Sequence, residues 1–131
     1  MLALVLPSMA AKTKNERLLE KLHRAKGSLP SLTKTWAARD KSWNRNPTPY
    51  QLAARAALDL GEGFLAFDIA ATGLAIFRSN ASLTQIQALA LARTGSPEAA
   101  NAALRLLAEA GHRDEETLGL LARTHKDLWQ L

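Results

Sequence analysis

The residues with catalytic side chains in this 131-residue sequence do not stand at catalytic spacings. His125, Lys126 and Asp127 are consecutive, whereas phosphodiester cleavage of the His-x-Lys type needs a residue between His and Lys and an Asp further along the chain. On a helix, three consecutive side chains point in three different directions. The sequence therefore predicts an exposed helix face at this place and no catalytic site.

The histidines also lack the spacing of a metal site. His23, His112 and His125 are far apart, and none has a second metal ligand at a suitable spacing on one helix face. There is no cysteine, so disulfides and thiolate sites are excluded and a cytoplasmic location is the default expectation. The Gly-Glu-Gly at 61–63 follows no predicted strand and is expected to be a turn. We expect no metal, no cofactor and no enzymatic activity.

A basic N-terminal segment is the alternative candidate for binding chemistry. Residues 12–45 hold ten Lys or Arg against three acids (+7), and residues 46–131 hold seven against nine (−2), which together give the net charge of +5. The candidate basic and aromatic patch consists of Lys34, Trp36, Arg39, Lys41, Trp43 and Arg45. Because Trp36 and Trp43 are seven residues apart, we expect both on one side of a single helix.

Two interpretations of this patch remain open. Basic side chains with interspersed tryptophans can bind nucleic acid or an anionic membrane surface. Alternatively, both tryptophans pack against the neighbouring helices and the basic side chains are merely solvated. We favour the second interpretation, because a charged run by itself is a weak signal and matches no known nucleic-acid-binding module. Nucleic acid is therefore the less favoured partner.

The elements that carry these residues are expected to be helices. The chain is rich in Ala, Leu, Arg, Glu and Gln, and only 5% of its residues are aromatic. Residues 12–26 predict an amphipathic helix with Leu18, Leu22 and Ala25 on one stripe. Residues 12–46 form a basic helical pair, which ends at the prolines near 47–49.

The first eleven residues are expected to be a disordered or cloning-derived lead. They resemble a signal peptide only superficially, because they lack a basic start and Pro7 ends the apolar run. No apolar run of the chain is long enough for a transmembrane segment.

A 34-residue repeat organises the rest of the chain. Small residues recur at this interval at the following positions: Gly61 and Gly95, Ala66 and Ala100, and Ala54, Ala88 and Ala122. Asn80 falls on Asp114 at the same shift. The repeats are predicted at 47–80 and 81–114, with a half repeat at 115–131. Alanines let paired helices approach closely, so we expect Ala54, Ala66, Ala88 and Ala100 at the helix crossings.

Polar residues and glycines mark the predicted helix ends. The predicted N-caps are Thr48, Ser82 with Gln85 in a capping box, Ser96 and Asp114, and the predicted stops are Gly61, Gly95 and Gly111. Together with the basic pair, these ends predict an all-α chain of about seven helices, arranged as antiparallel pairs in a short solenoid.

The period, the alanines and the turn glycines resemble the tetratricopeptide repeat (TPR), although Tyr50 replaces the usual tryptophan. The resemblance implies an α-α superhelix that acts as a scaffold or adaptor and binds a peptide or partner helix in a concave groove. Carried over by position, the groove residues are Gln51, Arg55, Asp59, Gln85, Leu89, Arg93, Arg123 and Lys126. This polar and basic lining suggests a carboxylate-bearing ligand. It lacks the asparagines of the chaperone-binding repeats.

The C-terminal stretch is similar to the TRAFs-binding region of apoptosis signal-regulating kinases and its bacterial counterparts. The residues that carry this likeness are Glu116, Thr117, Gly119, Arg123, Lys126 and Asp127. The resemblance implies that further helical repeats follow and that the chain is part of a longer protein. Four apolar residues of the last helix would then have no following helix to cover them. Since exposed apolar faces tend to associate, we expect self-association through Leu118, Leu121, Leu128 and Trp129, unless the N-terminal helices fold back over them.

Overall fold

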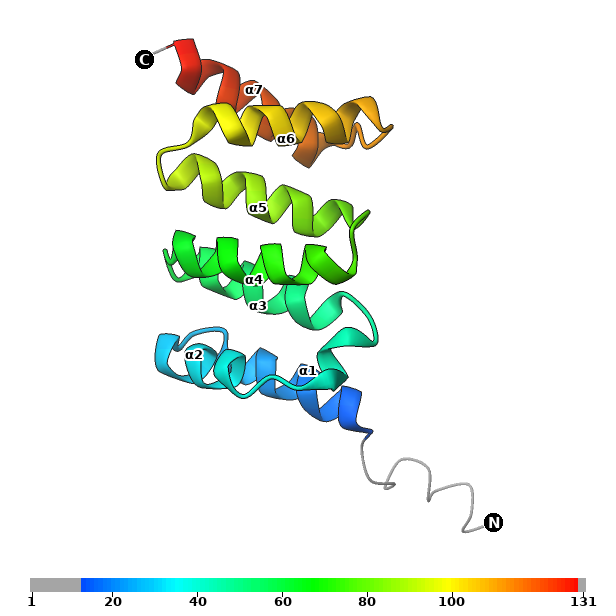
Figure 1. Cartoon of the computed structure of the whole chain (residues 1–131). Coiled ribbons are helices and arrows are strands. Elements are labelled where there is room, and N and C mark those ends of the chain that lie inside the picture. Colours follow the sequence, from blue (N-terminus) through cyan, green and yellow to red (C-terminus); the bar gives the residue numbers. More distant parts are fainter. Residues whose placement is uncertain (1–12, 130–131) are drawn as a thin grey trace, which may run out of the picture.

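The computed structural model describes residues 13–129, which form helices joined by short connections (Figure 1). The described part contains seven α-helices, one 3-10 helix and no strand. The elements are α1 (Lys14–Ala25), α2 (Leu29–Ala37), η3 (Lys41–Asn44), α3 (Thr48–Asp59), α4 (Gly63–Ile76), α5 (Ala81–Arg93), α6 (Pro97–Glu109) and α7 (Glu115–Trp129). The predicted all-α class is confirmed. The lead predicted at 1–11 lies outside the described residues.

The helices stack in chain order from α1 and α2 at one end to α7 at the other (Figure 1). From α3 onward each helix packs against the next one, and the first helices of successive pairs also touch, α3 against α5 and α5 against α7. This arrangement, in which each repeat contacts its neighbours, is that of a helical solenoid. The predicted solenoid of helix pairs is therefore confirmed.

The turn glycines end the helices in the same way at equivalent positions. Gly61 and Gly95 have φ angles of 79° and 90°, a region that residues with a Cβ rarely adopt. The backbone N–H of Glu62 donates to the carbonyl of Ala57 at 2.8 Å. Thirty-four residues later, Ser96 N–H donates to a carbonyl five residues back, also at 2.8 Å. These are Schellman caps, and they explain why glycine recurs at this interval.

The repeated alanines lie at the helix crossings, as predicted. Ala54, Ala66, Ala88 and Ala100 each have 0% of their surface exposed. Such complete burial of a methyl group leaves no room for a larger side chain. Ala122, at the third equivalent position, is exposed, because the described chain has no helix beyond α7 to cover it.

The predicted capping box at the start of α5 is wrong. Asn80 is the N-cap, and its side-chain oxygen accepts the Leu83 N–H at 2.9 Å. Ser82 lies inside the helix. Gln85 is buried, and its amide donates to residues of α7 and the loop before it. The Gln85 side chain, which the local spacing assigned to the capping box, therefore makes a tertiary contact instead.

Two other predicted caps differ in detail. Helix α3 begins at Thr48 itself, and the Thr48 N–H donates to the side-chain oxygen of Asn46 at 3.1 Å. Thr48 is thus the first helical residue and not the N-cap. Ser96 occupies the N-cap of α6 as predicted, but its side chain makes no capping hydrogen bond. Asp114 directly precedes α7, as predicted.

The N-terminal segment confirms one predicted helix and corrects the other. In α1, Leu18, Leu22 and Ala25 are buried, as the amphipathic pattern indicated. The expected single helix with both tryptophans is wrong, because α2 ends at Ala37 and Trp43 lies in η3. Asp40 causes the break: its carboxylate accepts the Ser42 N–H at 2.9 Å and starts the new turn.

An aromatic cluster joins the N-terminal helices to the first repeat. Trp36, Trp43, Tyr50 and Phe77 pack edge to face, with ring centroids 5.3 to 6.3 Å apart. The Tyr50 hydroxyl donates to the side-chain oxygen of Asn44 at 2.8 Å. Burial raises the pKa of Tyr50, so the ring stays neutral. The basic pair is therefore docked on α3, which both α1 and α2 contact.

Candidate partner-binding surface

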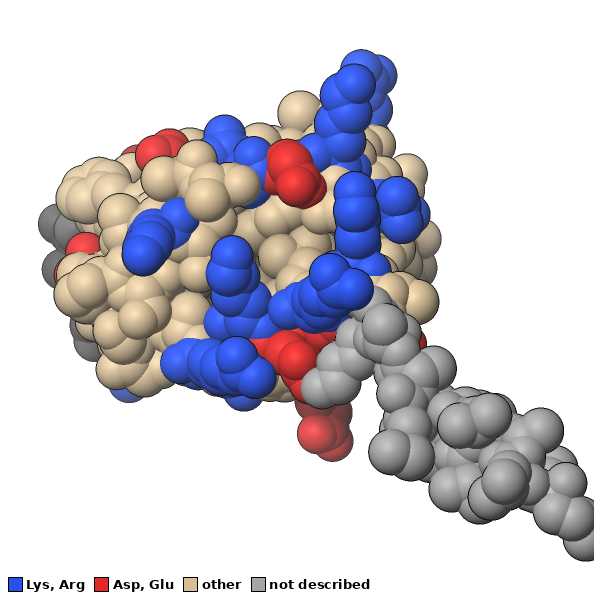
Figure 2. Space-filling view, turned by 90° about the horizontal axis from the view of Figure 1, so that it is seen from below, with Lys and Arg blue, Asp and Glu red and all other residues tan. Residues whose placement is uncertain are grey.

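The structure does not assemble the basic and aromatic patch as a stacking platform. Trp43 is only 2% exposed. Arg39 holds its guanidinium carbon 3.8 Å from the centroid of Trp36 and donates to the Trp36 carbonyl at 3.0 Å. Both indoles are thus engaged within the protein, in agreement with the favoured interpretation. Lys34, Lys41 and Arg45 are exposed, and Figure 2 shows Lys and Arg gathered over this end of the molecule.

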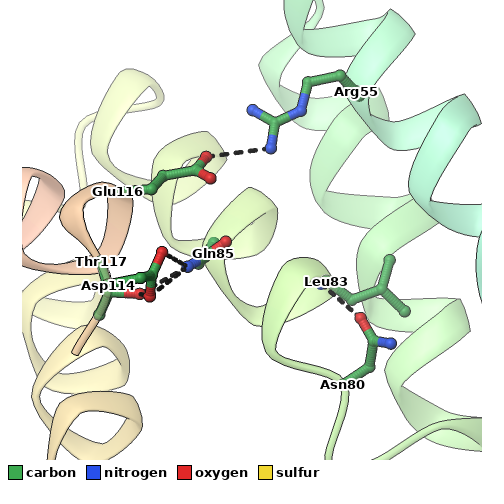
Figure 3. A network of polar contacts seen from close by, with 7 residues as sticks. All are labelled: Arg55, Asn80, Leu83, Gln85, Asp114, Glu116 and Thr117. Carbon is green, nitrogen blue, oxygen red and sulfur yellow. Dashed lines mark hydrogen bonds and ion pairs between the residues drawn. The ribbon is translucent and has the colours of Figure 1, made fainter. Parts of the chain in front are cut away.

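A polar contact repeats between the first helices of successive repeats. The amide nitrogen of Gln51, on α3, donates to the side-chain oxygen of Asn80 at 3.1 Å. The amide nitrogen of Gln85, on α5, donates to the Asp114 carboxylate at 3.2 Å and to the Thr117 hydroxyl at 2.6 Å. Figure 3 shows the second of these contacts, that of Gln85. Both donors and both acceptors are 34 residues apart, so this is one contact made twice.

These contacts also set the charge state of Asp114. The hydroxyl of Thr117 donates to its carboxylate at 2.7 Å, and this hydrogen bond lowers the pKa of Asp114 below its ordinary value. The amide of Gln85 acts in the same direction. Hydrogen bonds to a carboxylate favour its charged form. Asp114 is therefore held as an anion where α5 meets α7.

An ion pair crosses the surface formed by the first helices. The guanidinium of Arg55, on α3, lies 3.1 Å from the carboxylate of Glu116, on α7 (Figure 3). Packed helices are about 8–10 Å apart, so α3 and α7 would lie about 16–20 Å apart if α3, α5 and α7 lay in one plane. The side chains of Arg55 and Glu116 are long enough to span this distance, so the first helices of successive repeats share one surface on which they meet.

The other groove residues carried over from the TPR resemblance lie on the same three helices but differ in exposure. Asp59, Arg123 and Lys126 are exposed. Leu89 is half-buried against the hydrophobic core that α1 to α5 form. The guanidinium of Arg93 donates to the Leu58 carbonyl at 3.1 Å. Gln85, in contrast, is buried and holds the repeats together, so it is not free to meet a ligand.

Sequence reasoning missed the acidic and amide partners on this surface, namely Asn80, Asp114 and Glu116. A signal for two of them was present. The pairs Gln51–Asn80 and Gln85–Asp114 have the same separation of 29 residues and stand one repeat apart. No repeated pair of this kind indicates Glu116. The position equivalent to Glu116 one repeat earlier is Ser82, and the position equivalent to Arg55 one repeat later is Leu89.

The last helix leaves part of its apolar face open. Trp129 is 88% exposed and Leu118 is 38% exposed, whereas Leu121 and Leu128 are half-buried. Leu121 packs against the second core cluster, which α5 and α6 form. Part of the predicted association surface is therefore already used to dock α7 on the preceding repeat.

The described residues offer no metal site and no membrane span. Among residues 13–129, no group of three or more His, Asp or Glu is arranged to hold a metal ion. None of the helices between these limits is long and apolar enough to cross a bilayer.

The stacked pairs, the Schellman glycines and the polar contact repeated after 34 residues define a helical-repeat protein whose first helices share one surface. The family model of the tetratricopeptide repeats-sensor family (TPR-S) matches residues 53–131. The chain belongs to this family. The likeness to the TRAFs-binding region of apoptosis signal-regulating kinases stays a prediction.

A solved structure shares the fold. The Hsp90 co-chaperone Cns1 from Saccharomyces cerevisiae (delta69) is similar over 92% of this chain and 42% of its own, with a TM-score of 0.66 and 16% sequence identity. The chain thus spans less than half of the length of that structure. The similar region must include most of the segment before residue 53, so the likeness extends to the N-terminal helices. No curated protein sequence matches the chain.

Proposed function

We propose that the chain is a protein-interaction module in which the surface shared by the first helices binds an acidic segment of a partner protein. The membership of a TPR family supports the general role, because stacked helix pairs present their first helices as an extended binding surface. One observation carries the ligand class. Arg55 binds a carboxylate across this surface, at 3.1 Å, and this carboxylate belongs to the protein itself.

The carboxylate of Glu116 occupies the position that a ligand carboxylate would take. The side chains of Arg55 and Glu116 are 38% and 48% exposed, so the ion pair is open to solvent. Exposed ion pairs contribute only about 0.2–1 kcal/mol. A ligand carboxylate therefore displaces Glu116 at little cost, and Arg55 gains a new partner of the same kind.

Nearby basic side chains extend this site along the first helices. Arg93 on α5 and both Arg123 and Lys126 on α7 are exposed. Asp59, at the end of α3, and Asp114, before α7, are opposing charges on this surface. An extended acidic segment would thus meet positive charge on all three helices, and such complementarity favours rapid association.

Titration with a fluorescent oligoglutamate peptide tests the proposal. Arg55→Gln is expected to weaken binding, because the carboxylate loses its guanidinium partner. Glu116→Gln is expected to strengthen binding by roughly two- to fivefold, since it removes the internal competitor, a factor that corresponds to the strength of an exposed ion pair. If Glu116 had only a structural role, its replacement would not be expected to raise the affinity for oligoglutamate.

Arg105→Gln is the matched control, because Arg105 is an exposed arginine on α6, outside this surface. An oligoglutamine peptide controls for charge-independent binding. If Arg55→Gln binds oligoglutamate as the Arg105→Gln variant does, or if Glu116→Gln leaves the affinity unchanged, the acidic segment does not bind at Arg55 and the proposal is wrong.

A further inference from the structure

The outer face of α1 carries a stripe of basic side chains. Their positions follow the helical spacing of three, four and three residues, and they are Lys14, Arg17, Lys21 and Arg24. The buried residues of α1, namely Leu18, Leu22 and Ala25, lie next to this stripe, about a quarter of a turn around the helix. The helix spans twelve residues and is therefore about 18 Å long. None of these four residues belongs to the basic and aromatic patch predicted from the sequence.

The stripe forms one wall of an elongated hollow, here called the basic seam. A hollow of about 480 Å³ lies between α1 and the segment from α2 to η3, with Ala38, Asp40 and Ser42 on its second wall. Two smaller hollows adjoin it and share lining residues with it. The basic residues that line the three hollows are Lys14, Arg17, Lys21, Arg24, Lys34, Lys41 and Arg45.

The basic residues that line the three hollows outnumber the acidic ones. The lining acids are Glu20, which lies 3.9 Å from Arg24, and Asp40, whose carboxylate accepts hydrogen bonds from Ser42. Within residues 13–129, five of the basic side chains make no ion pair: Lys14, Lys21, Lys34, Lys41 and Arg45. Clustered like charges repel one another, and a bound polyanion relieves that repulsion.

Two features favour a nucleic-acid strand over other polyanions. The seam is a trough along a helix, which suits a chain of charges better than the flat surface of a bilayer. Arg39 lies in the sequence between the lining residues Ala38 and Asp40, is exposed, and holds its guanidinium over the ring of Trp36. A fixed guanidinium plane is a surface on which an unpaired base stacks, whereas a peptide of Asp and Glu has no ring that could stack on it.

We propose that the basic seam binds the phosphate backbone of a single-stranded nucleic acid, with Arg39 as the stacking surface for a base. Binding of this kind depends on phosphate charge and not on base sequence. The seam lies on α1, α2 and η3, whereas the proposed peptide site lies on α3, α5 and α7. The two proposals therefore stand or fall separately.

Fluorescence anisotropy with a labelled oligothymidylate of about 20 nucleotides, a length above typical single-strand site sizes, tests the proposal on the full chain. Each phosphate contact contributes about −0.7 to the slope of log affinity against log salt concentration. Five contacts give a slope of about −3.5, which is roughly a hundredfold loss between about 50 and 200 mM salt. The double variant Lys21→Glu, Lys34→Glu is expected to lose at least roughly tenfold in affinity, with a shallower slope.

The matched control is Arg105→Glu, Arg113→Glu, which changes the net charge equally at two exposed positions outside the seam. Circular dichroism of both variants tests whether they are folded. Arg39→Lys keeps the charge but removes the plane, so it is expected to weaken oligothymidylate binding and to leave inorganic polyphosphate binding unchanged. Equal losses in the seam and control variants would overturn the proposal. So would competition by oligoglutamate or anionic vesicles as strong as that by unlabelled oligothymidylate of equal charge.

Discussion

Gly73, in the interior of α4, allows α4 to approach α3 closely. A Cβ placed on Gly73 would lie 2.9 Å from Tyr50 Cβ, from Tyr50 Cγ and from Leu83 Cδ1. Carbon atoms in favourable contact are about 3.5–4.0 Å apart, so all three contacts would be too short. Tyr50 Cβ is fixed by the backbone of α3, so no change of rotamer moves it away. We therefore predict that Gly73→Ala forces α3 and α4 apart.

The magnitude follows from two opposing effects. Replacing glycine by alanine inside a helix stabilises it by about 0.5–1 kcal/mol. Overpacking a filled site costs about 1–3 kcal/mol. Gly119, in α7, is the matched control, because a Cβ there meets no atom within 4 Å. Gly119→Ala should stabilise the protein, and Gly73→Ala should lie about 1–3 kcal/mol below it in free energy of unfolding.

Urea denaturation followed by far-UV circular dichroism measures both variants against the parent. The comparison between them cancels the gain in helix propensity, so it isolates the packing cost. If Gly73→Ala proves as stable as Gly119→Ala, then α3 and α4 have room at this crossing. The explanation of Gly73 by close approach would then be wrong.

Three further predictions concern other parts of the stack. Ala66→Leu and Ala100→Leu should each lower the free energy of unfolding by about 1–3 kcal/mol in urea denaturation, because both alanines are fully buried; parent-like stability would refute the packing argument. Asp114 has a lowered pKa in the folded protein, so its contribution to the free energy of unfolding is present above its unfolded pKa near 3.8 and is lost as the pH falls through the folded value. Asp114→Asn should therefore flatten the acid side of a plot of the free energy of unfolding against pH. An unchanged plot would contradict the hydrogen-bond assignment. Sedimentation should show concentration-dependent self-association that Leu128→Glu, Trp129→Glu abolishes, whereas a parent that stays monomeric at high concentration would show that this exposed end of α7 binds no second copy.

The repeat register was predictable because it rests on backbone requirements. Gly61 and Gly95 end helices in a conformation that favours glycine, and Ala66 and Ala100 stand where two backbones meet. Such backbone requirements restrict the residue type at one position and do not depend on the residues elsewhere in the chain. The spacing of these residues therefore indicated the helix pairs and their order.

The helix starts were less predictable, because several polar residues near a start satisfy the same local pattern. Asn80 and Ser82 both suit an N-cap, and the choice depends on Gln85, whose partner Asp114 is 29 residues away. The helix predicted through Trp36 and Trp43 failed for a similar reason. Their spacing fits a helix, but it says nothing about Asp40, which caps the start of η3 between them.

The candidate sites depended still more on contacts between distant segments. Arg55 was predicted for the groove by position alone, but its carboxylate partner, Glu116, is 61 residues away. Trp43 of the predicted patch is buried, and Lys21, which the prediction did not include, lines the basic seam. Pattern alone does not distinguish a tryptophan that docks a helix from one that meets a ligand.

The pairing of Arg55 with Glu116 has a mechanical consequence for the whole array. In a solenoid held together by adjacent helices alone, each interface acts as an independent hinge, and bending compliance adds up along the stack. A bond from α3 to α7 bypasses α5 and acts as a cross-brace on the inner side, where it resists straightening of both hinges at once. Because the brace is an exposed ion pair, dissolved salt weakens it. We therefore expect the stack to bend more easily at high ionic strength than at low ionic strength.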